Sequence, residues 1–220
     1  MSQWQAEKKT VLEAAQKMAS RGLVVGTSGN ISLRLNTGAE RPLMAITPSG
    51  MHYDLLGADD IQIVDFNGHN VEGSLRPSME TTMHIGIYRA RKNINAVIHT
   101  HSVYASAAAV AGRAIPPILD DQVAFLGGEI QIAVHALSGS PEQAAAVIKA
   151  LGDRSGVLLA NHGAVATGRT MRNAFTAAEL IEKTAKIYLL AQSAGKVNRL
   201  PDEAIKAVKA IYDKLQNGNL

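Results

Sequence analysis

The sequence predicts an α/β fold in which a mainly antiparallel sheet is covered by helices. Two observations support this: apolar residues recur at helical spacing at both ends of the chain, and two short hairpin patterns lie in its first third. Helices and hairpins are interleaved rather than repeated as βαβ units, which favours antiparallel pairing. The 220 residues are enough to bury a large core, and we expect a single domain spanning residues 1–220.

The first elements follow from local pattern. A helix is expected over residues 3–21, where apolar side chains share one face and Gly22 provides a C-terminal cap. Alternating residues predict a hairpin from Ile31 to Ile46, with its turn at 36–38. A second hairpin is expected to begin with a strand at 61–66, because Asn-Gly follows it at a typical turn position.

The remaining elements are predicted from caps and periodicity. In chain order they are a helix from Ser78, its N-cap, to Lys92 with Glu80 in the first turn; a strand at 96–98; a helix at 102–111; a crossing loop at 114–126; a strand at 130–134; a helix at 141–151; a strand at 157–160; and helices at 170–194 and 202–215.

Composition excludes several classes of protein. The chain has no cysteine, so disulfide scaffolds, thiolate metal sites and cysteine nucleophiles are ruled out. A net charge of +3 with scattered basic residues and 4% aromatic residues does not favour nucleic-acid binding. Apolar runs are too short to cross a membrane, and no secretory pattern opens the chain, so we expect no membrane partner and a cytoplasmic location. A small anionic substrate is the expected partner.

Histidines are the strongest candidates for chemistry. His99 and His101 stand two apart at the end of a predicted strand, so both can face the same side. His162 follows another apolar strand and precedes Gly163. Three imidazoles with an open position are typical of catalytic zinc, but a His-x-His pair taken alone is more often structural than a metal site. The other histidines, His52, His69, His84 and His135, lack ligand spacing and are expected to be structural or exposed to solvent.

Two loops and one glutamate complete the candidate residues. The segments 26–30 and 47–50 could offer backbone N–H and hydroxyl donors to a phosphate, and Ser78 would add another donor. Each loop is also explained as an ordinary turn. Glu80 at a helix start is favoured by the helix dipole alone.

Taken in order, these motifs resemble the class II aldolase/adducin family. They are Gly-Thr-Ser-Gly-Asn at 26–30, Ile-Thr-Pro-Ser-Gly at 46–50, Pro-Ser-Met-Glu at 77–80, His-Thr-His at 99–101 and Asn-His-Gly at 161–163. The resemblance covers nearly the whole chain and is to the branch that contains L-fuculose-1-phosphate aldolase. It implies a three-layer α/β/α fold around a mainly antiparallel sheet, and a homotetramer with active sites between subunits.

The resemblance also assigns roles to residues. It implies that His99, His101 and His162 hold Zn²⁺, with Mn²⁺, Co²⁺ or Ni²⁺ as possible substitutes, and that Glu80 is an acid/base that can also bind the metal. It assigns the substrate phosphate to Gly29, Asn30, Ser49, Gly50 and Ser78.

The implied reaction is cleavage of a ketose 1-phosphate to dihydroxyacetone phosphate and a short aldehyde through an enediolate. L-fuculose 1-phosphate and a 5-deoxypentulose 1-phosphate are the substrate types expected. Zinc would act as the Lewis acid. For Glu80 to move the proton near neutral pH, we expect its pKa to be raised.

Two positions depart from the family pattern. Met79 replaces a serine hydroxyl often found beside the phosphate, and Asp120 stands where a tyrosine of the aldolase branch enters the neighbouring subunit's site. Asp120 is therefore either a catalytic residue donated across an interface or a cap of a loop or helix.

These departures leave other reactions open. Decarboxylation of a 3-oxo sugar-acid phosphate is the main alternative, followed by dehydration of methylthioribulose 1-phosphate. Epimerisation is disfavoured because that pattern has aspartate where this chain has Glu80. A non-catalytic scaffold resembling the adducin head would not need the metal ligands.

Overall fold

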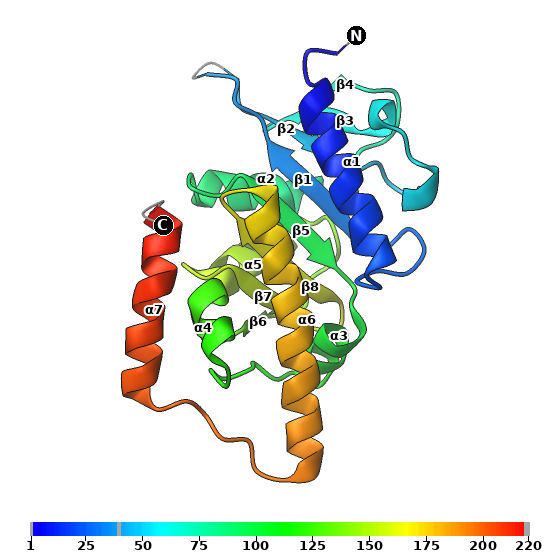
Figure 1. Cartoon of the computed structure of the whole chain (residues 1–220). Helices are drawn as coiled ribbons and strands as arrows, with labels where there is room; N and C mark the ends of the chain where they lie inside the picture. The colour runs from blue at the N-terminus through cyan, green and yellow to red at the C-terminus, as the bar shows by residue number, and fades with distance from the viewer. Residues whose placement is uncertain (1, 39–40, 218–220) are drawn as a thin grey trace.

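The computed structural model describes residues 2–38 and 41–217, and an eight-stranded sheet forms its centre (Figure 1). The strand order is β4-β3-β2-β1-β5-β8-β7-β6. Every neighbouring pair is antiparallel except β6 and β7, which are parallel. The strands are β1 (Asn30–Arg34), β2 (Leu43–Ile46), β3 (Gln62–Asp65), β4 (Asn70–Glu72), β5 (Ala96–Thr100), β6 (Gln131–Ala133), β7 (Gly156–Leu159) and β8 (Gly163–Gly168).

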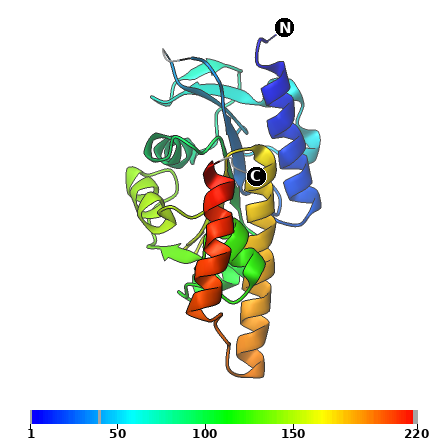
Figure 2. The same cartoon turned by 60° about the vertical axis from the view of Figure 1, so that its left-hand side comes forward.

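Helices cover both faces of this sheet, as the view along its edge in Figure 2 shows. On one face lie α1 (Gln5–Ser20), α3 (Val103–Val110) and α6 (Met171–Ala194); on the other lie α2 (Thr81–Ala90) and α5 (Pro141–Leu151). Two more helices, α4 (Asp120–Leu126) and α7 (Asp202–Asn217), pack against each other, and α4 also contacts α6. Two 3₁₀ turns, Tyr53–Leu55 and Ala58–Asp60, connect β2 to β3. The predicted three-layer fold with a mainly antiparallel sheet is confirmed.

Strand alternation divides the core between the two faces. Ile31 of β1 and Ile98 of β5 belong to the cluster under α1 and α6, whereas Val97 of β5 belongs to the cluster under α2 and α5. Successive side chains of a strand point to opposite faces. The polar residues Ser32 and His99 therefore project toward the α2 side, where their hydrogen-bond partners lie.

The helix predicted from Ser78 begins later than expected. The structure starts α2 at Thr81, so Glu80 precedes the helix instead of occupying its first turn, and Glu80 has non-helical ψ. Ser78 does not cap the helix. Its hydroxyl accepts the Glu80 backbone N–H at 3.2 Å, and its carbonyl accepts the Thr81 N–H. This tight turn leaves the Glu80 side chain free to point away from α2.

The structure differs from the expected elements in two further places. The second half of the predicted crossing loop at 114–126 forms α4, which Gly127 ends with a left-handed φ of 89°. The buried Gln122 stabilises this helix by bonding the backbone of the proline segment before it. The strand β8 was not predicted, although it pairs with both β5 and β7.

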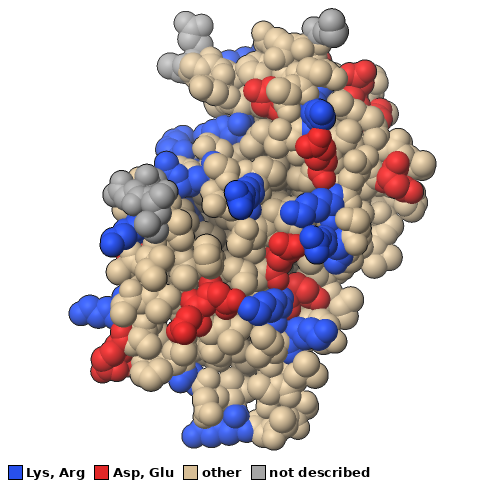
Figure 3. All heavy atoms as spheres, in the orientation of Figure 1, with Lys and Arg blue, Asp and Glu red and all other residues tan. Residues whose placement is uncertain are grey.

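The helical face toward the viewer in Figure 3 carries basic and acidic side chains in an interspersed pattern. Ion pairs between described side chains include Lys183 with Asp121 and Lys209 with Asp153. Among the described residues, none of the helices is both long enough and apolar enough to span a bilayer.

Candidate active site

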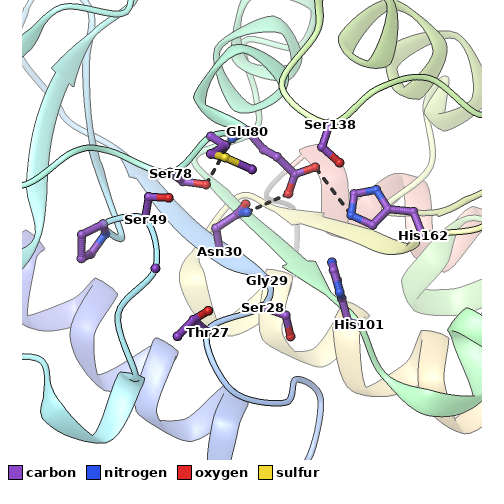
Figure 4. A pocket seen from close by; sticks show the side chains of 13 residues that line it. Thr27, Ser28, Gly29, Asn30, Ser49, Ser78, Glu80, His101, Ser138 and His162 are labelled. Carbon is purple, nitrogen blue, oxygen red and sulfur yellow. Dashed lines mark hydrogen bonds and ion pairs between the residues drawn. The ribbon is translucent and has the colours of Figure 1, made fainter.

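The candidate site lies at one end of the central strands, where four distant segments meet (Figure 4). The start of β1 supplies Asn30, and the register of the sheet places it opposite His99 of β5. His99 in turn lies opposite Val165 of β8, so the turn from β7 to β8 reaches the same end. The segment before α2 brings Glu80 above these strands.

The three predicted histidines converge on one point. His99 Nε2 lies 2.9 Å from His101 Nε2 and 3.3 Å from His162 Nε2. The Nδ1 atom of His99 donates to the carbonyl of Ala164 at 2.9 Å, which leaves Nε2 as the free nitrogen when the ring is neutral. Such spacing between three ligand atoms suits a single metal ion.

Backbone geometry holds His162 at this point. Asn161 adopts a left-handed φ of 57°, and the N–H of His162 donates to Leu159 O at 3.0 Å, forming a tight turn between β7 and β8. A Cβ atom on Gly163 would overlap the carbonyl oxygen of Thr100 and lie 3.2 Å from the His101 ring. Glycine is therefore required here because β8 begins in direct contact with the end of β5.

Glu80 faces the histidines and is held from both sides. Its Oε2 lies 3.0 Å from His99 Nε2 and accepts a hydrogen bond from Asn30 Nδ2 at 2.8 Å. Its Oε1 lies 3.9 Å from His162 Nε2 and accepts from Gln143 Nε2 at 2.6 Å. Glu80 is only 5% exposed.

The electrostatics of the site keep Glu80 ionised. Burial acts to raise the pKa of Glu80, but the charge of His99 and the hydrogen bonds from His99, Asn30 and Gln143 hold it well below its ordinary value. The expected rise of this pKa concerns the closed, substrate-bound site and stays a prediction. Burial likewise acts to lower the pKa of His99, yet the Glu80 charge and hydrogen bonds to Glu80 and Ala164 raise it. Burial and the charges of His99 and His162 lower the pKa of His101 to about 4.

The predicted phosphate residues line a cavity of about 180 Å³ beside the histidines, and all five lie there: Gly29, Asn30, Ser49, Gly50 and Ser78. A Cβ on Gly29 would come within 2.6 Å of His99 O, so glycine lets this loop approach β5. The Tyr53 hydroxyl donates to Gly29 O at 2.6 Å and fixes the loop further. Met79 and Ser138 also line the cavity, whereas no lysine or arginine of the described ranges 2–38 and 41–217 does.

Asp120 is not in the cavity of its own chain. It is exposed at the first position of α4, and the adjacent Asp121 pairs with Lys183.

Sequence reasoning missed two residues that contribute to the site. Gln143 of α5 bonds Glu80, and His84 is fully buried with hydrogen bonds to Asn30 and Ser32. A possible signal for His84 was its position one helical turn after Glu80; Gln143 gave no such signal.

The donor set fits a divalent cation. Three imidazole nitrogens and one carboxylate oxygen are the ligand types of zinc sites, and His99 has the fixed ring orientation that metal-ligating histidines show. An ion there would also replace the mutual repulsion of three closely spaced nitrogen lone pairs with attraction. The residues present therefore fit a bound metal.

Comparisons with known proteins agree with this geometry. Residues 9–189 match the class II aldolase and adducin N-terminal domain. The chain is 38% identical over 202 residues to 5-deoxy-D-ribulose 1-phosphate aldolase of Bacillus thuringiensis serovar kurstaki, covering 92% of this chain and 93% of that protein. It is 34% identical over 201 residues to L-fuculose phosphate aldolase of Escherichia coli K12, covering 91% of each.

A solved structure gives the same result for the fold. The structure of an L-fuculose 1-phosphate aldolase superposes with a TM-score of 0.90 at 35% identity, covering 97% of this chain and 98% of that one. The family match spans most of the chain and includes the candidate ligands and Glu80. The chain belongs to the class II aldolase and adducin family, and it is a class II aldolase.

Proposed function

We propose that this enzyme cleaves a ketose 1-phosphate into dihydroxyacetone phosphate and a short aldehyde, with 5-deoxypentulose 1-phosphates and L-fuculose 1-phosphate as substrate types. The convergence of three histidine Nε2 atoms with Glu80 beside a hydroxyl-lined cavity carries this proposal. The names of the two relatives above support it. Because its substrates would be phosphorylated metabolites, we place the enzyme in the cytoplasm.

His99, His101 and His162 would hold a divalent ion, which we propose to be zinc, with Glu80 as a further ligand before substrate binds. When bound, such an ion supplies Lewis-acid stabilisation for charge that develops on substrate oxygens. Imidazole sites also accept manganese, cobalt and nickel. The metal identity is therefore a measurable part of the proposal.

Glu80 would move the proton at the carbon that becomes nucleophilic. As a carboxylate it can accept a proton from that carbon, and closure of the site around a substrate is expected to raise its pKa and strengthen it as a base. Its two oxygens are oriented by Asn30 and Gln143, which limits rotation of the carboxylate. A base held in one orientation has less to reorganise when the proton moves.

The substrate phosphate would lie among neutral donors. The Ser49 N–H is already bonded to Arg76 O at 2.9 Å, so Ser49 would contribute its hydroxyl. The Ser78 hydroxyl accepts from the Glu80 N–H and retains its own hydrogen for the phosphate. Gly50, with a φ of 73°, keeps its backbone open to the cavity because nothing lies within 4 Å of a Cβ at this position. Gly29 and Asn30 form the floor of this site.

We also propose a homotetramer in which the active site is completed by a neighbouring subunit. Asp120 is exposed and lies outside the cavity of its own chain, so a catalytic role for it requires delivery from another subunit. Val25 and Leu137 are exposed in loops, close in sequence to the cavity residues Thr27 and Ser138, and give a neighbour apolar surface to cover.

The test is product analysis with metal quantification. Enzyme purified without chelators should contain about one divalent ion per chain by elemental mass spectrometry, and a coupled dehydrogenase assay should detect dihydroxyacetone phosphate from 5-deoxyribulose 1-phosphate or L-fuculose 1-phosphate. Release of CO₂ from 3-oxo sugar-acid phosphates, or dehydration of methylthioribulose 1-phosphate, without any aldol cleavage by the metal-loaded enzyme would overturn the proposed reaction.

A further inference from the structure

A chain of buried hydrogen bonds runs from Glu80 away from the cavity and between β1 and α2. Asn30 Nδ2 donates to Glu80 at 2.8 Å, and Asn30 Oδ1 lies 2.6 Å from His84 Nε2. His84 Nδ1 lies 2.7 Å from Ser32 Oγ, which lies 2.7 Å from the Tyr88 hydroxyl. All five side chains are buried, each no more than 5% exposed.

The proton positions along this chain follow from its fixed end. Glu80 is a carboxylate, so it can only accept, and the Asn30 amide must present its NH₂ group to it. Asn30 Oδ1 must then accept, which requires a hydrogen on His84 Nε2. His84 is fully buried, and its two ring nitrogens contact a neutral amide and a neutral hydroxyl, so the ring is neutral and its Nδ1 carries a lone pair.

The remaining donors are then determined. Ser32 must donate its single hydrogen to His84 Nδ1, so Tyr88 donates to Ser32 Oγ at 2.7 Å, and the Asn95 carbonyl oxygen, 3.3 Å away, is the more distant second acceptor of the Tyr88 hydroxyl. The hydrogen bonds that link Tyr88, Ser32, His84, Asn30 and Glu80 therefore all donate in the direction of Glu80. Polarised chains of this kind strengthen each bond within them, and all of these dipoles favour negative charge at the carboxylate.

We propose that His84 is a positioning residue for Glu80: as the Nε2–H tautomer it locks the Asn30 amide in the orientation that donates to the carboxylate. This inference rests on the proposed role of Glu80 in proton transfer. If His84 donated nothing to Asn30, the amide could rotate and present its oxygen to Glu80, which would repel it. The loss would therefore appear in the chemical step more than in substrate binding.

Three substitutions separate the parts of this argument. His84→Leu removes both bonds at similar volume. His84→Gln places an amide N–H near the former Nε2, so it can still donate to Asn30. Ser32→Ala removes the donor to Nδ1 and so releases the constraint on the tautomer. Thr184→Val is the matched control, because Thr184 is equally buried but its hydroxyl makes no hydrogen bond within the described structure.

The substitutions should change kcat rather than KM. His84→Leu should lower kcat by about 10- to 100-fold, as loss of a supporting hydrogen bond to a metal-site residue does, with KM and metal content changed less than about threefold. His84→Gln should recover most of this loss, and Thr184→Val should match the wild type. Equal activity of the Leu and Gln variants, or a loss explained entirely by lost metal, would overturn the proposal.

A measurement independent of activity tests the tautomer itself. In long-range ¹H–¹⁵N spectra of zinc-loaded, histidine-labelled protein, the resonances absent from His84→Gln identify His84. They should show a protonated Nε2 and an unprotonated Nδ1, and Ser32→Ala should introduce the other tautomer. A dominant Nδ1–H form in the wild type would refute the assignment even if Glu80 proves essential.

Failure of the proposed function would look different. If Glu80→Gln were as active as the wild type, the role of Glu80 would be wrong, whereas the spectrum of His84 would still report the direction of the chain. If His84→Leu does not fold, His84→Gln and Ser32→Ala carry the test, because each keeps a polar or small side chain at its buried position.

Discussion

Gly163→Ala should damage the metal site through a single methyl group. Neither Gly163 nor Gly168, at the two ends of β8, has a positive φ, so alanine can adopt both backbone conformations. The effect of the substitution is therefore steric. At Gly163 the new Cβ would lie well inside 3.0 Å of Thr100 O, next to both His101 and His162.

The size of the effect follows from the overlap. To restore ordinary contact, the start of β8 must move away from the end of β5 by roughly 1 Å. Metal–ligand distances tolerate only about 0.2 Å, so His162 and His101 could no longer hold one ion with good geometry. We expect metal affinity and turnover each to fall by about 10- to 100-fold, because misplacement by ~1 Å costs on this order.

Gly168→Ala provides a matched control at the other end of the same strand. A Cβ on Gly168 would overlap the backbone of α6, including Asn173 C at 2.8 Å. The steric overlap is therefore comparable to that at Gly163, but it lies at the end of β8 far from the histidines. Both variants should lose roughly 1–3 kcal/mol of stability through overpacking, which lowers Tm by about 2–4 °C per kcal/mol in a chain of this size.

The two variants are compared by thermal unfolding, by metal content and by competition with a chelating dye. Gly168→Ala should keep one ion per chain and wild-type turnover per folded molecule. If Gly163→Ala binds metal as tightly as Gly168→Ala at equal stability, the close approach of β8 to β5 does not set the geometry of the site.

Four further predictions concern single side chains. His162→Ala leaves two imidazole ligands, so the ion should be largely lost while circular dichroism stays native; stoichiometric zinc with normal turnover would contradict the ligand assignment. Glu80→Gln should keep the ion but lower turnover by about 10²- to 10⁴-fold, and undiminished exchange of the substrate α proton with deuterium would contradict the role of Glu80. Asp120→Asn should keep its metal and its assembly but lower turnover at least about tenfold. Mixed tetramers of Asp120→Asn and Glu80→Gln protomers should recover part of the activity, and no recovery would show that Asp120 is not donated across an interface. Burial acts to raise the pKa of Asp65, but hydrogen bonds from Arg41 and from the 67–69 turn outweigh it and lower this pKa to about 2. The ionised Asp65 should therefore contribute about 2 kcal/mol of stability above pH 4, and this contribution should be lost as the pH falls toward 2. Urea titrations at several pH values should show the loss in the wild type but not in Asp65→Asn.

Local pattern predicted those elements whose boundaries are set by local chemistry. The helix α5 has the bounds expected from sequence, because Ser140 caps it and Pro141 starts it. The strand β8 was missed because four of its six residues are glycine or alanine, which outweigh the strand-favouring Val165 and Thr167, and pairing on both sides forms it instead.

The residues of the candidate site also divide into those that local sequence could predict and those that depend on the folded structure. The ligands were found because His99 and His101 stand two apart at the end of a predicted strand and because the order of motifs resembled a family. Gln143 was not found, since it lies 63 positions from Glu80 and reaches it only when α5 packs beside α2. The lowered pKa of Glu80 depends on the same contacts and on His99, so it could not be predicted from residue type.

The alternation of β1 has a consequence for the accuracy of folding. A shift of one residue in the pairing of β1 with β5 would turn Ile31 toward Glu80 and drive the Asn30 amide into the apolar cluster under α1. The same misalignment that removes the donor to Glu80 thus also opens a defect in the core. Correct core packing and correct active-site geometry therefore depend on the same strand register. When Ile31 packs in the apolar cluster, Asn30 necessarily points toward Glu80.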